Sequence, residues 1–384
     1  MKAADLIRNE PFADLFTATL SDFLSLRFGG EWRVAWKKKS TSMTAQSWLV
    51  NLNINAIFRE GASRHALENT RREYATSVIP WKRPFQRLYF WLATSATPRF
   101  IAHAIVEIEP AIPDASQCLI IPSTHKIRFI DAAAGVVYCH LKKGSSAAHF
   151  QHEIQARELA ASKGVPVPRI LERISDLCIA EQMVVGTPLN RLTSRDQRAD
   201  GLERALHALE PLYRSTARQA KLADYATFIL SRIETVAAAR KENVSKRALA
   251  LAKQLVNAIC SADRVVELVR SHGDFQPGNI LYDQGKIWLI DWEYSSEKQR
   301  HYDLLTYTIK VRSPYNLAKR ITAFARALPN GLQLWQLRLL LLESIGFESE
   351  AVMVASSQYA PRDFIARLAE FEKALPFVLS GARA

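Results

Sequence analysis

Residues 271–293 constrain the fold of this chain more than any other stretch. Two acids, Asp274 and Asp291, stand there with an amide, Asn279, five residues after the first acid and twelve before the second. One apolar run follows the amide, another precedes the second acid, and Asp-Gln-Gly-Lys joins them with the composition of a hairpin turn. The pattern predicts two short antiparallel strands that carry oxygen-bearing side chains at their ends.

This arrangement suits phosphoryl transfer. One carboxylate orients a substrate hydroxyl and accepts its proton, while an amide oxygen and a second carboxylate hold Mg²⁺ on nucleotide phosphates. An Asp followed by an Asn is common, and His-Gly-Asp in a turn also serves simply to cap a strand. However, a buried hairpin with carboxylates at both ends is costly unless the charges meet a metal or a partner. The flanking apolar runs therefore favour the catalytic interpretation.

The stretch resembles the aminoglycoside phosphotransferase and choline kinase family, the small-molecule branch of the protein-kinase-like fold. Members carry His-Gly-Asp-x-x-x-x-Asn, then Ile-Asp-Trp-Glu, then a Tyr-Asp-Leu element, matched here by residues 302–304. Gly273 and the pair Trp292-Glu293 stand where protein kinases have Arg and Phe-Gly, which favours the small-molecule branch. The resemblance implies an α+β, bilobal protein-kinase-like fold with a β-rich nucleotide lobe and a helical C-terminal lobe.

The resemblance also implies site roles. Asp274 is the expected base, and His272 supports the catalytic loop. Asn279 and Asp291 are the expected metal ligands. ATP and Mg²⁺ are the implied donor and cofactor, and the acceptor is a hydroxyl of a small molecule or of a sugar or glycan intermediate.

Upstream, three strands joined by tight turns and a following helix fit the opening of a kinase-like nucleotide lobe. The third strand ends in Lys142 and Lys143, whose side chains point to opposite faces. The family pattern favours Lys142 as the lysine that reaches the phosphates. The expected elements are strands at 118–121, 127–130 and 136–141 and a helix over 147–163.

Glu153 in that helix is the expected ion-pair partner of the phosphate lysine, with Glu158 as the fallback. The alternative is that Glu153 and Arg157 form an exposed pair one turn apart, worth only a few tenths of a kcal/mol. Backbone groups near Glu181 and Met183, in the linker between the lobes, are expected to read the adenine edge.

The first turn of the meander departs from the family pattern. A kinase phosphate loop normally contains glycines, but residues 122–126 contain none. Ser123 and Thr124 offer hydroxyl groups to a phosphate and Lys126 offers charge, or the segment is a plain turn that binds nothing. A non-catalytic nucleotide-binding pseudokinase therefore stays an alternative. A protein kinase is the other, although no activation segment is recognisable.

Three domains are expected. Residues 1–112 form a small α+β domain of unknown role, 113–186 the nucleotide lobe, and 187–384 the helical lobe with the catalytic hairpin. The front elements are a helix over 11–28, strands at 31–36 and 48–58, and a helix over 63–76 capped by Ser63. Helices are also expected at 202–214, 225–240, 245–260, 263–271, 332–345 and 362–379.

Five tryptophans of the front segment offer two interpretations, a platform for stacking sugars or, for most of them, core packing. They are Trp32, Trp36, Trp48, Trp81 and Trp91.

The net charge of +13 raises the question of nucleic acid, but the basic residues are spread along the 384-residue chain without a nucleic-acid-binding signature. We therefore do not expect a nucleic-acid partner. A basic surface suits an anionic acceptor equally well, and it leaves peripheral contact with an anionic membrane open.

The chain lacks a run of about 18 apolar residues, so no transmembrane segment is expected. The opening ten residues lack the apolar core of a signal peptide. Four scattered cysteines without a CxxC pair predict reduced, buried thiols and no zinc site. A cytoplasmic location is the expectation.

Overall fold

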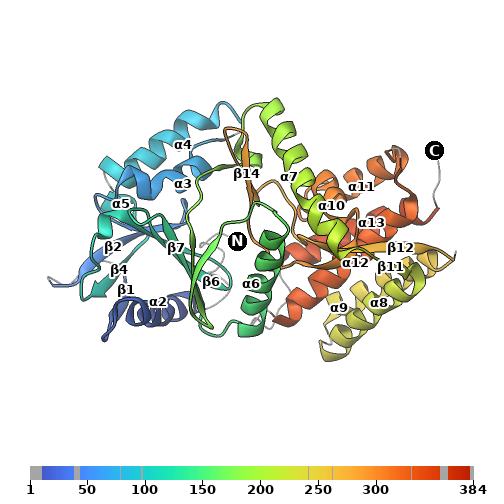
Figure 1. Cartoon of the computed structure of the whole chain (residues 1–384), viewed down its shortest axis with the longest axis horizontal. Coiled ribbons are helices and arrows are strands. Elements are labelled where there is room, and N and C mark those ends of the chain that lie inside the picture. The colour runs from blue at the N-terminus through green and yellow to red at the C-terminus, as the bar shows by residue number, and fades with distance from the viewer. Residues whose placement is uncertain are drawn as a thin grey trace. The chain divides into compact units, whose positions relative to one another are not determined.

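The computed structural model describes residues 11–38, 44–77, 79–96, 98–240, 242–261, 263–329, 331–354 and 362–380. The opening ten residues, on which the signal-peptide expectation rests, lie outside these ranges. The chain divides into two compact units. The first comprises Met1–Ser162, Pro166–His207 and Gly278–Ile290, and the second comprises Lys163–Val165, Ala208–Pro277 and Asp291–Ala384. In Figure 1 the strands of the large sheet are coloured from blue to green, and the part of the chain coloured from yellow to red is mostly helical.

The first unit is built on one nine-stranded sheet whose neighbouring strands are antiparallel. Its order is β1 (Arg33–Lys37), β4 (Ala104–Glu109), β2 (Gln46–Asn51), β3 (Ala56–Arg59), β5 (Cys118–Pro122), β6 (Lys126–Asp131), β7 (Val136–Leu141), β9 (Cys178–Gln182) and β8 (Ile170–Ser175). The helices of this unit are α2 (Phe12–Phe28), α3 (Arg64–Tyr74), α4 (Lys82–Trp91), α5 (Pro98–Ile101) and α6 (Ala147–Ser162).

Both faces of this sheet are covered, because successive strand side chains point to opposite faces. Ile120 and Phe129 belong to a core that includes Phe16 and Phe23 of α2. Their strand neighbours, such as Leu119, belong to a second core that includes residues of α3, α4 and α6. The strands of the meander are thus buried on both sides, which makes their positions rigid.

The expected boundary at residue 112 is not a break in this sheet. β3 of the front segment pairs with β5 of the nucleotide lobe, with Ile57 opposite Ile120 and Phe58 opposite Leu119. The front segment and the nucleotide lobe therefore share one sheet and the same two cores, instead of forming separate layers.

A second, three-stranded sheet holds the predicted hairpin. It has the order β10 (Thr187–Pro188), β13 (Ile280–Asp283) and β14 (Lys286–Leu289). The turn at Gln284 and Gly285 has φ values of 47° and 83°. Two successive positive φ values are the geometry of a tight two-residue hairpin, so the turn chemistry confirms the prediction.

The second unit packs helices around a large apolar core and one small sheet. Its strands are β11 (Arg218–Lys221), β12 (Val265–Ser271) and β15 (Ser296–Gln299). Its helices are α8 (Leu222–Ala239), α9 (Asn243–Ile259), α10 (Tyr302–Ile309), α11 (Leu317–Arg326), α12 (Leu334–Val354) and α13 (Arg362–Ser380), and α7 (Arg195–Thr216) runs from the first unit into it. None of the helices that the structure describes is long and apolar enough to cross a membrane.

Most expected elements are confirmed, including the front helix, the three-stranded meander and the Ser63 cap, whose hydroxyl accepts a hydrogen bond from Ala66 N at 3.1 Å. Two predictions are wrong. The helix expected over 263–271 is strand β12, which pairs on both sides with β11 and β15. The single strand expected over 48–58 is the hairpin β2–β3, which turns through Asn55 at φ 53°.

Candidate active site

A buried carboxylate fixes the backbone that precedes Asp274. Asp303, at the start of α10, accepts hydrogen bonds from the backbone N–H of His272 at 2.8 Å and of Gly273 at 3.1 Å. The Tyr213 hydroxyl donates a third bond at 2.7 Å. Burial raises the pKa of Asp303, and these donors act against that rise. The Tyr-Asp-Leu element thus lies directly under the His-Gly-Asp loop.

Gly273 is required at its position in this loop. Its φ is 85°, and a Cβ there would lie 1.9 Å from the carbonyl oxygen of Tyr294. The His272 ring is fully buried and packs on Trp292, with ring centroids 4.6 Å apart. His272 is therefore part of the packing beneath the loop, and its role stays a prediction.

The Asp274 carboxylate is held by two side chains. Arg312 Nε donates to one oxygen at 3.1 Å, and Gln276 Nε2 donates to the other at 2.8 Å. Arg312 also donates to the carbonyl of Gly273 at 2.8 Å and forms an ion pair with Glu348 at 3.4 Å. These bonds fix the orientation of the carboxylate.

Arg312 was not identified from the sequence. It lies in the turn after α10, and its guanidinium carbon lies 3.5 Å from the ring centroid of Phe347. Burial acts to lower its pKa, but Tyr302, Asp274 and Glu348 together raise it. Arg312 therefore carries a permanent charge beside Asp274, and a contact across this much sequence leaves no local pattern.

One of the two expected metal ligands, Asn279, lies at the open end of the hairpin. The backbone N–H of Ile290 donates to the carbonyl of Asn279 at 3.0 Å, one step beyond the paired strands β13 and β14. Asn279 is therefore opposite the residue that precedes Asp291. Asp291 itself has a φ of 62°, a left-handed conformation that is uncommon for a non-glycine residue and concentrates at functional sites.

The side chains of Asn279 and Asp291 offer oxygen ligands of the kind that hard divalent cations such as Mg²⁺ take. Amide and carboxylate oxygens are hard ligands, and Mg²⁺ is commonly held by one or two protein groups together with water and phosphate oxygens. Within the described ranges, no group of three His, Cys, Asp or Glu side chains is placed to hold a metal. Cys118, Cys139 and Cys178 are free and buried, while Cys260 is free and exposed, so the expectation of buried thiols holds for three of the four.

Glu153 of α6 forms a buried ion pair with Lys126, and its expected pairing with Lys142 stays a prediction. Lys126 Nζ lies 2.6 Å and 2.7 Å from the two oxygens of Glu153. Both side chains are almost fully buried, so the alternative of an exposed Glu153–Arg157 pair is wrong. Arg157 is also buried and pairs with Glu181 at 2.6 Å. The fallback, Glu158, is on the exposed side of the helix and pairs with Arg173.

Lys126 begins β6, the second strand of the meander, whereas Lys142 follows β7, the third. The sequence analysis gave Lys126 only an auxiliary charge. Lys142 is buried too, and its backbone N–H donates to the carbonyl of His125 at 2.8 Å. Burial and the neighbouring charges of His149, Lys142 and Lys126 lower the pKa of His125 to about 4. The two lysines therefore share one strongly basic corner.

The turn that was expected to bind phosphate is closed on itself. The Ser123 hydroxyl donates to the carbonyl of Lys126 at 2.7 Å, and its backbone N–H donates to the same oxygen at 3.0 Å. Thr124 is partly exposed at the tip of the turn.

The predicted adenine-reading segment follows the same sheet. Glu181 lies in β9, with its carboxylate on Arg157, and the backbone N–H of Met183 donates to the carbonyl of Gly135 at 2.8 Å. Val184, the next residue, accepts a bond from the Asn69 side chain at 3.1 Å. Backbone pairing to the meander thus continues one residue past the end of β9.

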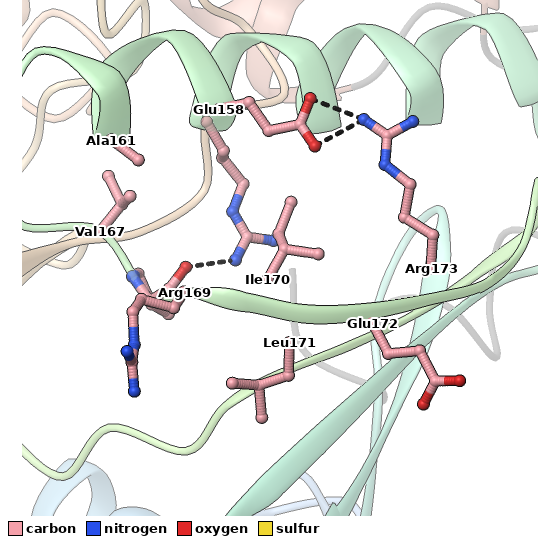
Figure 2. Close-up of a pocket in the computed structure, with 10 residues that line it drawn as sticks. Glu158, Ala161, Val167, Arg169, Ile170, Leu171, Glu172 and Arg173 are labelled. Atoms are coloured by element: carbon pink, nitrogen blue, oxygen red, sulfur yellow. Dashed lines mark hydrogen bonds and ion pairs between the residues drawn. The ribbon is translucent and has the colours of Figure 1, made fainter.

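A pocket of about 420 Å³ lies elsewhere in the first unit, between α6 and β8. Figure 2 shows its lining, in which the Glu158–Arg173 ion pair bridges the helix and the strand. Arg157 donates to the carbonyl of Pro168 at 2.9 Å in the same region. Of the residues considered for the site, only the fallback Glu158 lines this pocket. Asp274, Asn279 and Asp291 are not among its lining residues.

The sequence model of the phosphotransferase enzyme family matches residues 125–337, more than half of the chain. The chain therefore belongs to the phosphotransferase enzyme family, and its fold is protein-kinase-like. No significant relative was found among curated proteins.

Solved structures of this class resemble the chain at low identity. A thermostable mutant of aminoglycoside phosphotransferase APH(4)-Ia is 17% identical, with 70% of this chain and 95% of that one covered and a TM-score of 0.48. A choline kinase from Cryptosporidium parvum Iowa II is 14% identical, with 69% and 92% covered and a TM-score of 0.47. A choline/ethanolamine kinase family protein from Mesorhizobium loti is 16% identical, with 68% and 95% covered and a TM-score of 0.39.

Proposed function

We propose that this phosphotransferase is an ATP- and Mg²⁺-dependent kinase whose acceptor is a hydroxyl group of a small molecule, a sugar or a glycan intermediate. The observation that carries the proposal is the Asp274 carboxylate, which a buried arginine orients on a backbone clamped by Asp303. An aligned carboxylate on a rigid loop is what hydroxyl activation in phosphoryl transfer requires. The basic net charge of +13 favours an acceptor that is itself anionic.

Asp274 would accept the hydrogen bond of the acceptor hydroxyl and align its oxygen with the γ-phosphate. It would take the hydroxyl proton as the new oxygen–phosphorus bond forms and the bond from the γ-phosphorus to the bridging oxygen breaks, which releases ADP. Arg312 and Gln276 keep the carboxylate from rotating, because each of its oxygens already accepts one bond. His272 and Asp303 hold the backbone.

Asn279 and Asp291 would hold the metal ion. When bound, Mg²⁺ neutralises negative charge on the phosphates and on the leaving group. The left-handed backbone of Asp291 supports this role, because strained residues concentrate where a side chain must be aimed. Lys126 and Lys142 supply positive charge for the nucleotide phosphates, and Glu153 fixes the first of them.

The test combines nucleotide binding with transfer. The wild type is expected to be stabilised against heat by ATP with Mg²⁺ and to label at least one component of a small-molecule extract from γ-labelled ATP. Asp274→Asn is expected to keep the nucleotide-induced thermal shift and to lower the rate of transfer about 10³-fold. Asp291→Asn should lose both the metal-dependent part of the shift and the transfer. Undiminished transfer by Asp274→Asn would show that the base is another group.

A matched pair of variants isolates the role of Arg312. Arg312→Met and Arg367→Met each remove one partner of Glu348, but only the first removes a side chain that contacts Asp274. Arg367 also donates to the carbonyl of Arg312 at 2.8 Å, so its loss affects the position of Arg312 only through the backbone and Glu348. Arg312→Met is expected to lower the turnover number about 10–100-fold with little change in nucleotide binding, because the carboxylate loses its orientation. Arg367→Met should lose stability alone. Equal turnover losses in the two variants would assign the effect to Glu348 and not to Asp274.

A non-catalytic nucleotide-binding protein is the second candidate, and the closed turn of Ser123 favours it. Both polar hydrogens of Ser123 are directed to the Lys126 carbonyl, and residues 122–126 contain no glycine. Stabilisation by ATP without transfer to any acceptor in the extract would support this candidate. Label that appears on protein and not in the small-molecule fraction would instead support a protein kinase.

A further inference from the structure

Two of the tryptophans in the front segment are not used in packing. Trp32 and Trp48 are buried, whereas Trp81 and Trp91 are 66% and 54% exposed. Phe85 and Leu88 lie between them and are 66% and 54% exposed. Large apolar side chains this exposed, and this close together in the chain, are unusual for the surface of a protein that binds nothing there.

These four residues form one stripe, which we call the α4 stripe (Trp81, Phe85, Leu88 and Trp91). Their spacing of four, three and three residues places them on one side of a helix with 3.6 residues per turn. The rings of Trp81 and Phe85 lie 6.4 Å apart, edge to face. Phe90 falls on the opposite side of the helix and is buried in the second core of the sheet. The stripe therefore points away from the core that holds α4.

The charges within the segment of sequence that carries the stripe have one sign. Residues 74–106 contain no Asp or Glu, but they contain Lys82, Arg83, Arg87 and Arg99. Helix geometry places Lys82 on one flank of the stripe and Arg87 on the other. Both are exposed, and within the described ranges no carboxylate forms an ion pair with either of them. Arg99 is different, because it pairs with Glu60 at 2.7 Å.

Exposed apolar character continues past the helix. Phe100 of α5 is 91% exposed. An aromatic ring with so little contact to its own chain contributes nothing to folding, so it adds apolar area to the same basic, carboxylate-free segment.

We propose that the α4 stripe docks this protein on an anionic lipid surface. An amphipathic helix with Trp, Phe and Leu on one side and Lys and Arg on its flanks is suited to lie in the interface of a bilayer, its apolar side between the lipid headgroups. The convex helix presents protruding rings without a groove, so a fluid surface fits it better than a shaped protein partner. Lys82 and Arg87 complement anionic headgroups, and the absence of carboxylates removes the repulsion that would oppose contact. The proposal is independent of phosphotransfer.

Flotation of the full-length protein with lipid vesicles tests the proposal. Vesicles of phosphatidylcholine mixed with phosphatidylglycerol are expected to bind the protein at least about tenfold more strongly than vesicles of phosphatidylcholine alone, because two unpaired cations lie at the surface. Raising the ionic strength from about 0.05 M to about 0.5 M should weaken this binding several-fold.

Trp81→Ser/Phe85→Ser separates the stripe from general basicity. Both side chains are exposed, so the melting temperature should stay within about 2 °C of the wild type, while vesicle binding falls at least about tenfold. Phe228→Ser is the matched control, since Phe228 is a 55% exposed aromatic on α8 with an arginine, Arg232, over its ring at 5.6 Å. It should bind vesicles as the wild type does. Lys82→Gln/Arg87→Gln should remove most of the preference for anionic lipid.

Three results would overturn the proposal. The first is absence of binding to either kind of vesicle. The second is equal binding by the wild type and Trp81→Ser/Phe85→Ser. The third is a dimer by light scattering that this double variant converts to a monomer without any lipid binding, which would make the stripe a contact between two copies of the chain.

Discussion

At the residue scale, the candidate site depends on side chains that come from distant parts of the sequence. Asp274 is oriented by Arg312, and the loop before it is held by Asp303. The Lys126–Glu153 pair likewise joins the start of a strand to the middle of a helix. The bonds of Asp303 and the Lys126–Glu153 pair are buried, and the Asp274–Arg312 pair is partly buried, so each fixes the geometry of the segments that it joins.

The Lys126–Glu153 pair gives a prediction for stability. Removing one partner of a buried ion pair leaves an uncompensated charge, so Lys126→Met and Glu153→Gln should each lower the free energy of unfolding by about 3 kcal/mol. The combined variant should lose less than the sum of the two, because no charge then remains unpaired. Urea denaturation measures all three. Strict additivity would show that the two side chains do not stabilise each other.

The same variants separate the two lysines in function. The Lys126→Met/Glu153→Gln protein is expected to stay folded. If Lys126 contacts the nucleotide, this variant should lose the thermal shift that ATP gives the wild type. Lys142→Met is the comparison, since Lys142 is buried in the same basic corner. A lost shift in Lys142→Met with a normal shift in the Lys126 variants would return the phosphate role to Lys142.

His125 gives a prediction for pH dependence. Its pKa is lowered from an ordinary value of 6.5 to about 4 in the folded protein, chiefly by burial and then by His149, Lys142 and Lys126. Between pH 6.5 and 4 the unfolded chain therefore binds more protons at this residue than the folded chain, so stability falls as the pH falls through this window. The expected loss in the free energy of unfolding is about 1–3 kcal/mol, because the ring is only half-buried.

His125→Asn should remove this contribution. The free energy of unfolding of the wild type minus that of the variant should decrease by this amount between pH 7 and pH 4, as measured by urea denaturation at several pH values. Taking the difference cancels the other histidines that both proteins share. A difference that does not change with pH would contradict the assigned cause.

At the element scale, the sequence predicted the elements whose conformation is specified by neighbouring residues and missed those that depend on distant strands. The β13–β14 hairpin is local, because Gln284 and Gly285 specify the turn and the flanking runs specify the strands, and it was predicted correctly. Strand β12 was predicted as a helix, because a short run such as Val-Val-Glu-Leu-Val fits both periods. Its strand conformation comes from β11 and β15, which pair with it from distant positions.

The site divides in the same way. The sequence positions of Asp274, Asn279 and Asp291 came from a motif of fixed spacing, and their roles remain predictions. Arg312 and the choice of Lys126 for Glu153 depend on how strands and turns meet in space, which spacing along the chain does not encode. The ion pair with Lys126 joins Glu153 to the second strand of the meander, and the role expected of Lys142 after the third strand stays a prediction.

Two glycines with nearly the same φ give a prediction about stability. Gly273 lies in the loop before Asp274, and Gly285 lies in the turn between β13 and β14. Gly273 has a φ of 85° and Gly285 a φ of 83°, but only at Gly273 would a Cβ collide with backbone, 1.9 Å from the Tyr294 carbonyl oxygen. Gly285→Ala should therefore lower the free energy of unfolding by about 1–2 kcal/mol, the cost of the left-handed backbone alone. Gly273→Ala should lose at least about 4 kcal/mol, because the loop must also move. Equal losses by denaturant unfolding would contradict the close approach.

At the scale of the whole molecule, the front segment is structurally part of the nucleotide lobe. β3 pairs with β5 across the expected boundary, and the α2 ring of Phe23 lies 5.1 Å from that of Phe129 and 5.7 Å from that of Tyr138. The strands of the meander therefore have one face covered by a helix that lies outside the residues matched to the family. We therefore expect the family's own region to depend on the front segment for folding in this chain.

A truncated chain of residues 113–384 tests this dependence. It would expose the hydrogen-bonding edge of β5 and the apolar face that α2 covers, so it is expected to aggregate on expression, since unpaired edges and large apolar faces promote association. In the full chain, Phe23→Ala should lower the free energy of unfolding by about 3–5 kcal/mol. Phe28→Ala on the same helix is the control and should lose under about 1 kcal/mol, because Phe28 is 38% exposed. Residues 113–384 recovered as a soluble monomer that unfolds cooperatively would restore the boundary at residue 112, because the sheet would then be shown to tolerate the loss of four of its strands.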